Sequence, residues 1–452
     1  MRTRHAALAV VTAGAILAAP LAAGLQPAAA VGTDSDPFPC AGFGMQDRAN
    51  PISDLDRDLY TWGPYKRTKV GNGRHDINWK LDPHKQDSWK TLFHGLKWTG
   101  AYVYRSTEGP TRLRDPKAID GAVAIAQDWV KDNRYPWPTG PGAGNATHDR
   151  ADFLICLRMG LTQIGKPVPS WLNTTLVQHA EWLKKNTWAD HNVGTDQTLA
   201  ILGIGCTVGR RDLRDYAANK LAKDITRVID SQGANNEQAV GYARWNHDLW
   251  GEVETAMTRC GINTPASRTI KARRAALQTF LEYALKPDGT YHQLGDTQLE
   301  RPSASTMTEA QRWVVTDGKQ GVAPKERVKI YNAGYVLGRS GWGNQWRPQS
   351  HESSYALRFG PVRTGHGHSD HTAITWHTIG RPILVDTGTG SYNQDAWRAH
   401  YIGPEAHNQL VMTGMRNGSA TKLVRSKLTP KADFYQFSDT PTSRRVGSAA
   451  SS

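Results

Sequence analysis

Beyond its first thirty residues the sequence has no apolar run long enough to cross a membrane. The one long apolar stretch, Ala6 to Leu25, follows Arg2 and Arg4 and is closed by Ala28-Ala29-Ala30. A charged start, an apolar middle and small residues at the junction are typical of a secretory signal, cut here after Ala30. An uncleaved anchor is the alternative, because the stretch is nearly long enough to span a bilayer. We therefore expect residues 1–30 to be a leader. The remainder would be secreted, or held in the cell envelope or periplasm as a second choice, without stable membrane insertion.

Cysteine is scarce as well, with Cys40, Cys156, Cys206 and Cys260 as the only four. No CxxC pair or Cys/His finger spacing occurs, which argues against cysteine as a metal ligand. An oxidising destination permits disulfides, and four cysteines allow three pairings. Cys156 and Cys206 also lie in apolar helical patterns, where a free buried thiol is equally plausible. The sequence leaves the pairing open.

Acidic residues are outnumbered, at 41 against 55 basic residues, for a formal net charge of +14. The leader contributes Arg2 and Arg4 and no acids, which leaves +12. A basic exported protein attracts polyanions by long-range steering. Nucleic acid is not expected as a partner, because no zinc-finger spacing or RNA-binding signature is present. An anionic polysaccharide suits an exported protein better, and a generically basic surface is the alternative.

The pattern of apolar residues changes once along the chain, from helical to strand-like. From about residue 89 to residue 285, apolar residues such as Leu176, Ala180 and Leu183 recur at three- and four-residue steps, and turn residues such as Gly209 separate the units. This pattern predicts several antiparallel helices joined by short turns. After Tyr331, runs rich in aromatic and branched residues predict antiparallel strands.

One strand pair has a recognisable turn. Gly380-Arg381, between Thr372–Ile379 and Pro382–Asp386, predicts a two-residue hairpin loop with glycine first. These sequence patterns predict a helical domain over residues 31–325 and an antiparallel β domain over 326–437. The composition of residues 438–452 predicts a disordered tail. Only about 120 residues follow the start of the β domain, near the size of one small sandwich.

Histidine is concentrated in Gly365-His366-Gly367-His368-Ser369-Asp370, which is followed by Asp386 and by Ala406-His407-Asn408. If this segment is a strand, His366 and His368 point to one face. Two histidines with a carboxylate form a familiar three-ligand zinc set. We therefore predict His368, Asp386 and His407 as metal ligands. The alternative is that Asp386 caps a turn and the histidines only form hydrogen bonds.

Two other polar segments are weak signals singly. Asp190–Gln197 opens an apolar helix, where Asp and Asn are ordinary caps. Glu237–Trp245 places Tyr242 and Arg244 near the start of another helix, where a lone tyrosine is more often a core residue.

Together, in this order, the segments resemble the heparinase II/III-like polysaccharide lyases, a group that also includes alginate and oligoalginate lyases. The resemblance covers most of the chain after the leader and rests on these segments: Asp76–Pro83, Gln238–Tyr242, Gly289–Asp296, Tyr331–Ser340, the H-x-H-x-D run, G-R-P-x-L-x-D-x-G around Asp386, and Ala406–Asn408.

The resemblance implies an α+β multidomain fold, in which an N-terminal incomplete (α/α) toroid precedes an antiparallel β-sandwich that is apparently truncated here. It also implies cleavage of uronic-acid polysaccharides by β-elimination. Its site residues match these positions: Asn192, Tyr242 and His366 as catalytic groups, Arg244, His191 and Glu237 as substrate-binding groups, and His368, Asp386 and His407 around a structural zinc ion.

The family's pattern is broken at Val193, where members usually carry a histidine. Val193 cannot neutralise a uronate, so Arg244 or another cation would have to help. The substrate stays open among heparin or heparan sulfate, alginate and glucuronan.

Three other readings remain. The first is an anionic-glycan-binding protein without catalysis. The second is a glycoside hydrolase, which needs two carboxylates roughly 5–10 Å apart. Asp196, Glu237 and Asp296 are its candidates, but none of them forms a recognisable pair in the sequence. The third is a hydrolase with a catalytic zinc.

Overall fold

A computed structural model describes residues 50–108, 111–140, 142–188, 192–390, 392, 395–411, 415–416, 420–439 and 442–443. The predicted leader, Cys40 and His191 lie outside the described residues, as does most of the predicted tail. Ser438 and Asp439 of that tail form the end of a strand.

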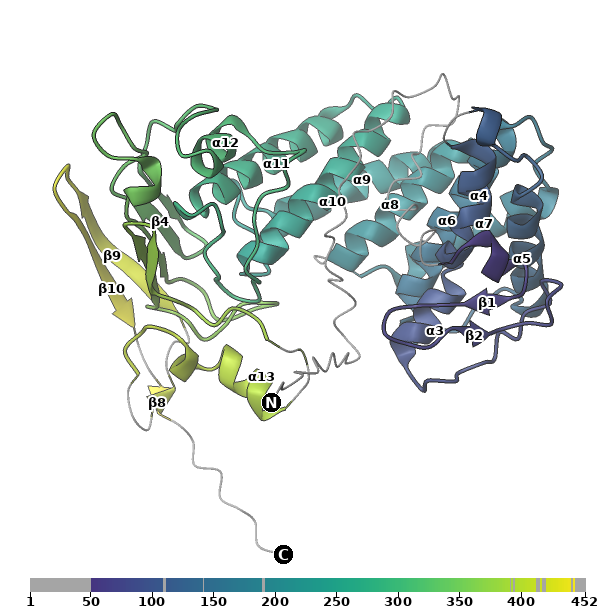
Figure 1. Cartoon of the computed structure of the whole chain (residues 1–452), viewed down its shortest axis with the longest axis horizontal. Coiled ribbons are helices and arrows are strands. Elements are labelled where there is room, and N and C mark those ends of the chain that lie inside the picture. Colours follow the sequence, from purple (N-terminus) through teal and green to yellow (C-terminus); the bar gives the residue numbers. More distant parts are fainter. Residues whose placement is uncertain are drawn as a thin grey trace, which may run out of the picture.

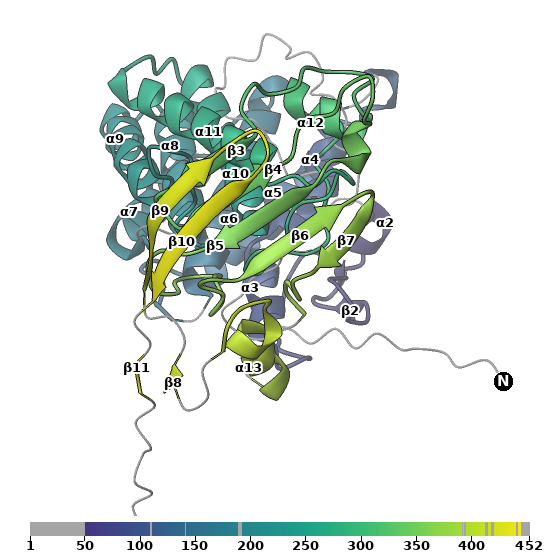
Figure 2. The same ribbon diagram turned by 90° about the vertical axis from the view of Figure 1, so that its left-hand side faces the viewer.

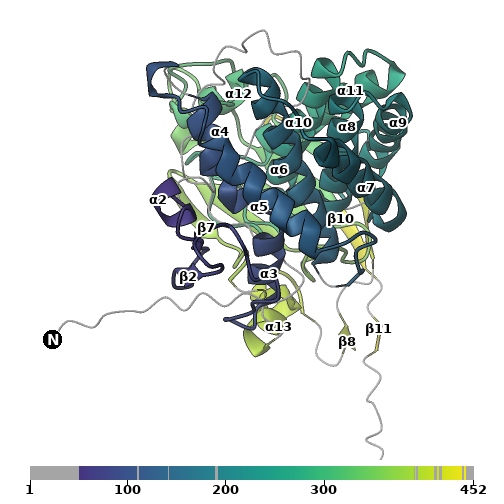
Figure 3. The ribbon, with the colours of Figure 1, turned by 90° about the vertical axis from the view of Figure 1, so that its right-hand side faces the viewer.

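Helices make up the first part of the described chain, with one short pair of strands, β1 (Leu59–Tyr60) and β2 (Thr68–Lys69), near its start. The helices are α2 (Ile52–Leu55), α3 (Asp87–His94), α4 (Gly100–Thr107), α5 (Ile119–Asp132), α6 (Ala143–Gln163), α7 (Ser170–Asn186), α8 (Asn192–Thr207), α9 (Arg211–Val228), α10 (Val240–Arg259), α11 (Pro265–Tyr283) and α12 (Glu309–Val315). Consecutive long helices run back and forth and curve round one end of the molecule (Figures 1 and 3).

The helix α8 lies between α6, α9 and α10 and is buried on nearly all sides, as expected for a helix that is apolar all round. It ends before Gly209, and α10 ends before Gly261, each glycine with a positive φ (76° and 66°) that costs it little. The disulfide Cys206–Cys260 joins the ends of α8 and α10, and Cys156 is buried in α6 outside this disulfide. The structure thus selects one pairing among those that the sequence left open.

The second part is an antiparallel sheet of five strands in sequential order. Its strands are β3 (Val328–Tyr331), β4 (Tyr335–Arg339), β5 (Ser354–Arg358), β6 (Ile374–Thr378) and β7 (Arg381–Leu384). The β6–β7 loop was predicted one residue too late. Thr378 pairs with Arg381, so the loop is Ile379-Gly380 with φ values of 48° and 69°, and glycine is its second residue. Two positive φ values define a type I′ turn.

A hairpin of β9 (Thr421–Leu428) and β10 (Asp433–Asp439) lies over one face of this sheet (Figure 2). Tyr435 and Phe437 of β10 pack against Tyr355 and Phe359 of the sheet. The hairpin leaves Ile383 of β7 about half exposed, at 49%. The second layer of the sandwich therefore covers only part of the first.

The remaining elements are short. They are the helix α13 (Ala396–Ile402), the strands β8 (Met415–Arg416) and β11 (Thr442–Ser443), and 3-10 turns that include η1 (Lys97–Thr99) and η4 (Pro404–Ala406). Within the described ranges, none of the helices is both long and apolar enough to cross a bilayer. The predicted order, helices first and an antiparallel sheet second, is confirmed.

Candidate active site and metal centre

The histidine cluster lies in the loop between β5 and β6, and the prediction that it forms a strand is wrong. The loop is bound instead to the helical part. The backbone N–H of His366 donates to the carbonyl of Glu237 at 2.9 Å, and that of Asp296 donates to the carbonyl of His366 at 2.9 Å. Because the backbone N–H and carbonyl of His366 bond to Glu237 and Asp296, they are not available for pairing with a neighbouring strand of the sheet.

Gln238 holds the same loop through its side chain. Its amide nitrogen donates to the Val362 carbonyl at 3.1 Å, and its amide oxygen accepts from the Thr364 N–H at 3.0 Å. A Cβ at Gly367 would lie 2.4 Å from the Gln238 amide oxygen, so only glycine fits there. Gln238 itself adopts a positive φ of 58°, an uncommon conformation that these contacts over-determine. The segment before α10 and the histidine loop are therefore one unit.

This unit places Tyr242, in the first turn of α10, against His366. Their rings stack with centroids 3.5 Å apart and planes 8° apart. The Tyr242 hydroxyl lies 3.2 Å from the hydroxyl of Tyr392, which follows β7. A phenol and an imidazole are thus presented together where the helical and β parts meet.

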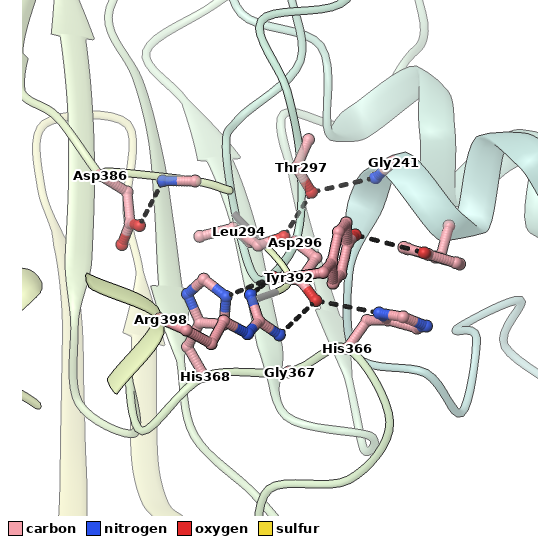
Figure 4. Close-up of polar contacts among 12 residues, drawn as sticks. Gly241, Leu294, Asp296, Thr297, His366, Gly367, His368, Asp386, Tyr392 and Arg398 are labelled. Carbon is pink, nitrogen blue, oxygen red and sulfur yellow. Dashed lines mark hydrogen bonds and ion pairs between the residues drawn. The ribbon is translucent and has the colours of Figure 1, made fainter. Parts of the chain in front are cut away.

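Asp296 is the polar centre of the site (Figure 4). Its carboxylate accepts from His366 Nδ1 and His368 Nε2, both at 2.9 Å. Arg398 of α13 donates to both of its oxygens, at 2.5 and 2.8 Å. The side chain of Asp296 is fully buried. Burial disfavours its charge, but the hydrogen bonds from His366, His368 and Arg398 outweigh burial and hold the pKa of Asp296 below its usual range.

Two other titratable groups next to His366 are biased toward their neutral forms. Burial raises the pKa of Tyr242 well above its ordinary value, and Tyr392, Glu237 and Asp296 raise it further. Burial also raises the pKa of Glu237. Tyr242 is therefore a protonated hydroxyl near neutrality and suits proton donation better than proton abstraction.

Glu237 lies on the other edge of the His366 ring. Its Oε1 accepts from the Asn246 amide at 2.8 Å. Its Oε2 is buried, has no hydrogen-bond partner among the described residues, and lies 3.6 Å from His366 Nε2. That separation is too long for a hydrogen bond. Because the residue is only 3% exposed, Glu237 faces His366 rather than solvent.

The three predicted metal ligands are brought together. One ligand atom each of His368, Asp386 and His407 lies within 4.8 Å of the others, and all three residues are buried. His368 Nδ1 and His407 Nε2 are buried and have no hydrogen-bond partner in the part of the chain that the structure describes. Two imidazole nitrogens that are available beside a carboxylate match the ligands that zinc prefers, so this group could hold a zinc ion.

A second group, of one histidine and two aspartates, fits a metal less well. His148, Asp149 and Asp152 also offer ligand atoms within 4.8 Å of one another. However, the Lys97 ammonium already lies 2.7 Å from Asp149 Oδ1 and 3.1 Å from Asp152 Oδ2. A metal ion would have to compete with this built-in cation.

The remaining predicted site residues are not joined to this centre by any contact within the described ranges. Asn192 is the first residue of α8, is buried, and accepts from the Val193 N–H at 2.6 Å. Arg244 points to the other side of α10, where its Nε donates to Glu300 at 2.6 Å. His191 lies outside the described residues.

Sequence reasoning missed Tyr392 and Arg398 and noticed Asp296 only as a candidate acid of a hydrolase. Arg398 reaches Asp296 across 102 residues, and Tyr392 reaches Tyr242 across 150. No local spacing reports contacts of this range. The one available signal was the unexplained arginine and tyrosine between two predicted metal ligands, Asp386 and His407.

The arrangement of a curved helical layer joined to an antiparallel β domain is shared with solved structures of a heparan sulfate lyase and a heparinase III. Residues 324–449 match the sequence model described as heparinase II/III-like, C-terminal. This match covers the β domain, and the predicted resemblance to heparinase II/III-like proteins is confirmed.

Solved structures with the same fold include a heparan sulfate lyase, HepC, from Pedobacter heparinus, at 18% identity and a TM-score of 0.65 over 87% of this chain. Two heparinase III structures match as well, at 14% identity with a TM-score of 0.67 over 88% of this chain, and at 17% with 0.65 over 87%. The chain spans 64% of the length of the first of these proteins and 67% of the other two. No curated protein matches this sequence.

Proposed function

We propose that this protein is a polysaccharide lyase of the heparinase III type, which cleaves a uronic-acid-containing polysaccharide by β-elimination. The reaction removes the proton from C5, breaks the C4–O4 bond, forms the C4=C5 double bond and supplies a proton to O4. The observation that carries the proposal is the stack of Tyr242 on His366, which presents one proton donor and one imidazole side by side.

In this proposal His366 Nε2 takes the C5 proton and the Tyr242 hydroxyl protonates O4, after which water restores both groups. The raised pKa of Tyr242 keeps its hydroxyl protonated, as a proton donor must be at the start of the reaction. The hydrogen bond of His366 Nδ1 to Asp296 supports a lone pair on Nε2. Glu237, 3.6 Å from that nitrogen, leaves it unpaired and would position His366 rather than bind substrate.

The uronate carboxylate must be neutralised before C5 becomes acidic enough. Asn192 is proposed for this role from the resemblance. A cation is also needed, and Arg244 is held by Glu300. Arg363 is better placed, because its half-buried side chain donates from Nε to the Gly367 carbonyl at 2.6 Å, between His366 and His368. Its terminal nitrogens carry no hydrogen bond within the described ranges and remain for an anion.

Zinc held by His368, Asp386 and His407 would be structural. Its charge would fix three buried ligands that come from separate loops and so stabilise the loop that carries His366. Neither of the two proposed proton transfers involves the zinc ion.

Heparan-sulfate-like polymers are the first substrates to test. The excess of 55 basic over 41 acidic residues favours a polyanion, and the structures with the same fold are named as heparan sulfate lyase and heparinase III. Alginate and glucuronan remain the second choices, and the predicted leader suggests that the polymer is met outside the cytoplasm.

The proposal is tested by near-ultraviolet absorbance of the folded protein with heparin, heparan sulfate, hyaluronan, alginate and glucuronan. Elimination conjugates the new double bond with the carboxylate, which then absorbs, whereas hydrolysis yields no such product. A rise with one polymer supports the proposal and identifies the substrate. Reducing ends without absorbance would indicate a hydrolase, and binding without either signal would indicate a glycan-binding protein.

A further inference from the structure

We propose that Asp296 is a positioning residue shared by two sites: one carboxylate sets the proton positions of both His366 and His368 and thereby couples the metal centre to the catalytic histidine. The inference rests on the proposed function only for the catalytic role of His366. The arrangement of Asp296 and its partners follows from contacts within the described residues. Figure 4 shows Asp296 between the two histidine rings, with Arg398 closing the group.

Each oxygen of Asp296 meets one histidine and one arginine nitrogen. Oδ1 lies 2.9 Å from His368 Nε2 and 2.5 Å from Arg398 Nη1, while Oδ2 lies 2.9 Å from His366 Nδ1 and 2.8 Å from Arg398 Nη2. An ionised carboxylate accepts hydrogen bonds only. Both histidine nitrogens that face it must therefore carry protons.

In their neutral forms the two histidines consequently have opposite tautomers. His366 is protonated on Nδ1, which leaves the lone pair on Nε2, the nitrogen that the proposed reaction uses. His368 is protonated on Nε2, which leaves the lone pair on Nδ1. This buried nitrogen has no hydrogen-bond partner among the described residues and is therefore available to bind a metal. These assignments follow from the hydrogen-bond pattern. Asp296 thus prepares one histidine for chemistry and the other for metal binding.

Arg398 allows Asp296 to accept hydrogen bonds from both histidines. It offers only donors, so it keeps Asp296 ionised without competing for the histidine protons. Its helix is held in place because Asp395 caps it through the Arg398 N–H at 2.9 Å and Ile402 accepts from the Ser369 N–H at 2.9 Å. The arginine therefore approaches Asp296 from a fixed direction.

Another aspartate of the β domain, Asp433, also forms an ion pair with one arginine and serves as the matched control. Asp433 also accepts two hydrogen bonds from one arginine, Arg327, at 2.5 and 2.6 Å, and a third from the Tyr355 hydroxyl at 2.6 Å. No histidine contacts Asp433 within the described residues. Substitution of Asp433 reports the cost of losing such a pair without any effect on histidine tautomers.

The test is nitrogen-15 NMR of the histidine rings, with and without one equivalent of Zn²⁺, together with zinc affinity. It compares the wild type, Asp296→Asn and Asp433→Asn, with signals assigned through His366→Gln and His368→Gln. We expect the wild type to show His366 with its proton on Nδ1 and His368 with its proton on Nε2. An asparagine accepts through one atom and donates through the other, so it cannot accept from both histidines. Asp296→Asn should switch one tautomer and weaken zinc binding about 10- to 100-fold, and Asp433→Asn should do neither.

The same tautomer on both wild-type histidines would overturn the proposal without any variant. Unchanged tautomers and unchanged zinc affinity in Asp296→Asn would also overturn it. If the variant does not fold, the wild-type spectrum still decides. Because these measurements contain no polysaccharide, a protein without lyase activity but with the expected spectra would contradict the proposed function alone. If lyase activity is found, Asp296→Asn should lower kcat far more than it raises KM.

Discussion

The phenol ring of Tyr242 lies flat against the imidazole of His366, with ring centroids 3.5 Å apart. The two residues come from different parts of the fold, the first turn of α10 and the loop between β5 and β6. The pair therefore exists only where the helical and β parts are joined, and Gln238 and Asp296 provide that joint through hydrogen bonds to both sides. The proposed chemistry depends on this junction more than on either part alone.

Tyr242→Phe should reduce turnover by about 10²- to 10⁴-fold, the usual contribution of a positioned acid. The ring and its stacking on His366 are kept, so the melting temperature should stay nearly unchanged. Turnover is followed by absorbance of the unsaturated product. Tyr104→Phe, a change at a half-exposed tyrosine of α4, is the control and should retain full activity. A Tyr242→Phe enzyme with wild-type turnover would remove Tyr242 from the mechanism.

His407→Ala should lower both the bound zinc per chain and the thermal stability, because two ligands hold the ion more weakly than three. Elemental analysis and calorimetry measure these two quantities. His371→Ala is the matched control, since His371 is also buried in the same region but lies outside the ligand group and contacts the Pro361 carbonyl instead. Equal zinc content in His407→Ala and the wild type would show that His407 is not a ligand.

The order of the two domains could be predicted because it follows from local patterns of apolar residues. The His–Asp–His group could be predicted because it consists of residue types that are uncommon in such a concentration. The positions of Asp296, Tyr392 and Arg398 could not, since each acts through contacts between loops that are far apart in sequence. Arg244 illustrates the opposite problem. It lies two residues after Tyr242 on α10, and a helix turns by about 100° per residue, so the two side chains face different ways. Nearness in sequence therefore misled the prediction for Arg244, whose partner is Glu300.

Stability should fall in acid partly through His94. Burial, together with the charge of Arg150, lowers the pKa of His94 from 6.5 to about 4. The ring accepts from Trp129 Nε1 at Nδ1 and faces the Trp79 carbonyl with Nε2, a pattern that requires the neutral form. Its folded pKa is below its unfolded pKa, so the stabilisation is present above pH 6.5 and is lost as pH falls through 4.

The contribution of His94 is at most about 3 kcal/mol in the free energy of unfolding. Urea unfolding between pH 4 and 7.5 should show a shallower dependence in His94→Gln, because glutamine can make both hydrogen bonds without titrating. His400→Gln, at an exposed histidine of α13, should keep the wild-type slope. Identical slopes in all three proteins would contradict the assignment.

Trp397 should contribute to binding of the polysaccharide. It is 67% exposed on α13, next to Arg398, and stacks on Tyr401 with ring centroids 6.3 Å apart. Exposed aromatic faces suit sugar rings, and a contact of roughly 1 kcal/mol predicts a rise in KM of about 3- to 10-fold for Trp397→Ala. Trp346, 85% exposed in a turn before β5, is the matched control. Equal KM values for Trp397→Ala and Trp346→Ala would contradict this role.

The disulfide Cys206–Cys260 should stabilise the helical part, because it closes a segment of 54 residues. The loop-entropy estimate for a segment of this length is about 4 kcal/mol. Calorimetry of Cys206→Ser/Cys260→Ser should show a lower melting temperature that no longer responds to a reductant. The wild type and Cys156→Ala should both remain sensitive to the reductant. A wild-type melting temperature that reductant leaves unchanged would argue against the bond.

The most direct test of the account is the mass of the oligosaccharides that the protein releases from heparan sulfate in water enriched in oxygen-18. β-Elimination adds no water, so the account predicts products with an unsaturated end that lack the label. Tyr242→Phe should release almost none of them. Saturated products carrying one oxygen-18 would identify a hydrolase and contradict the central claim.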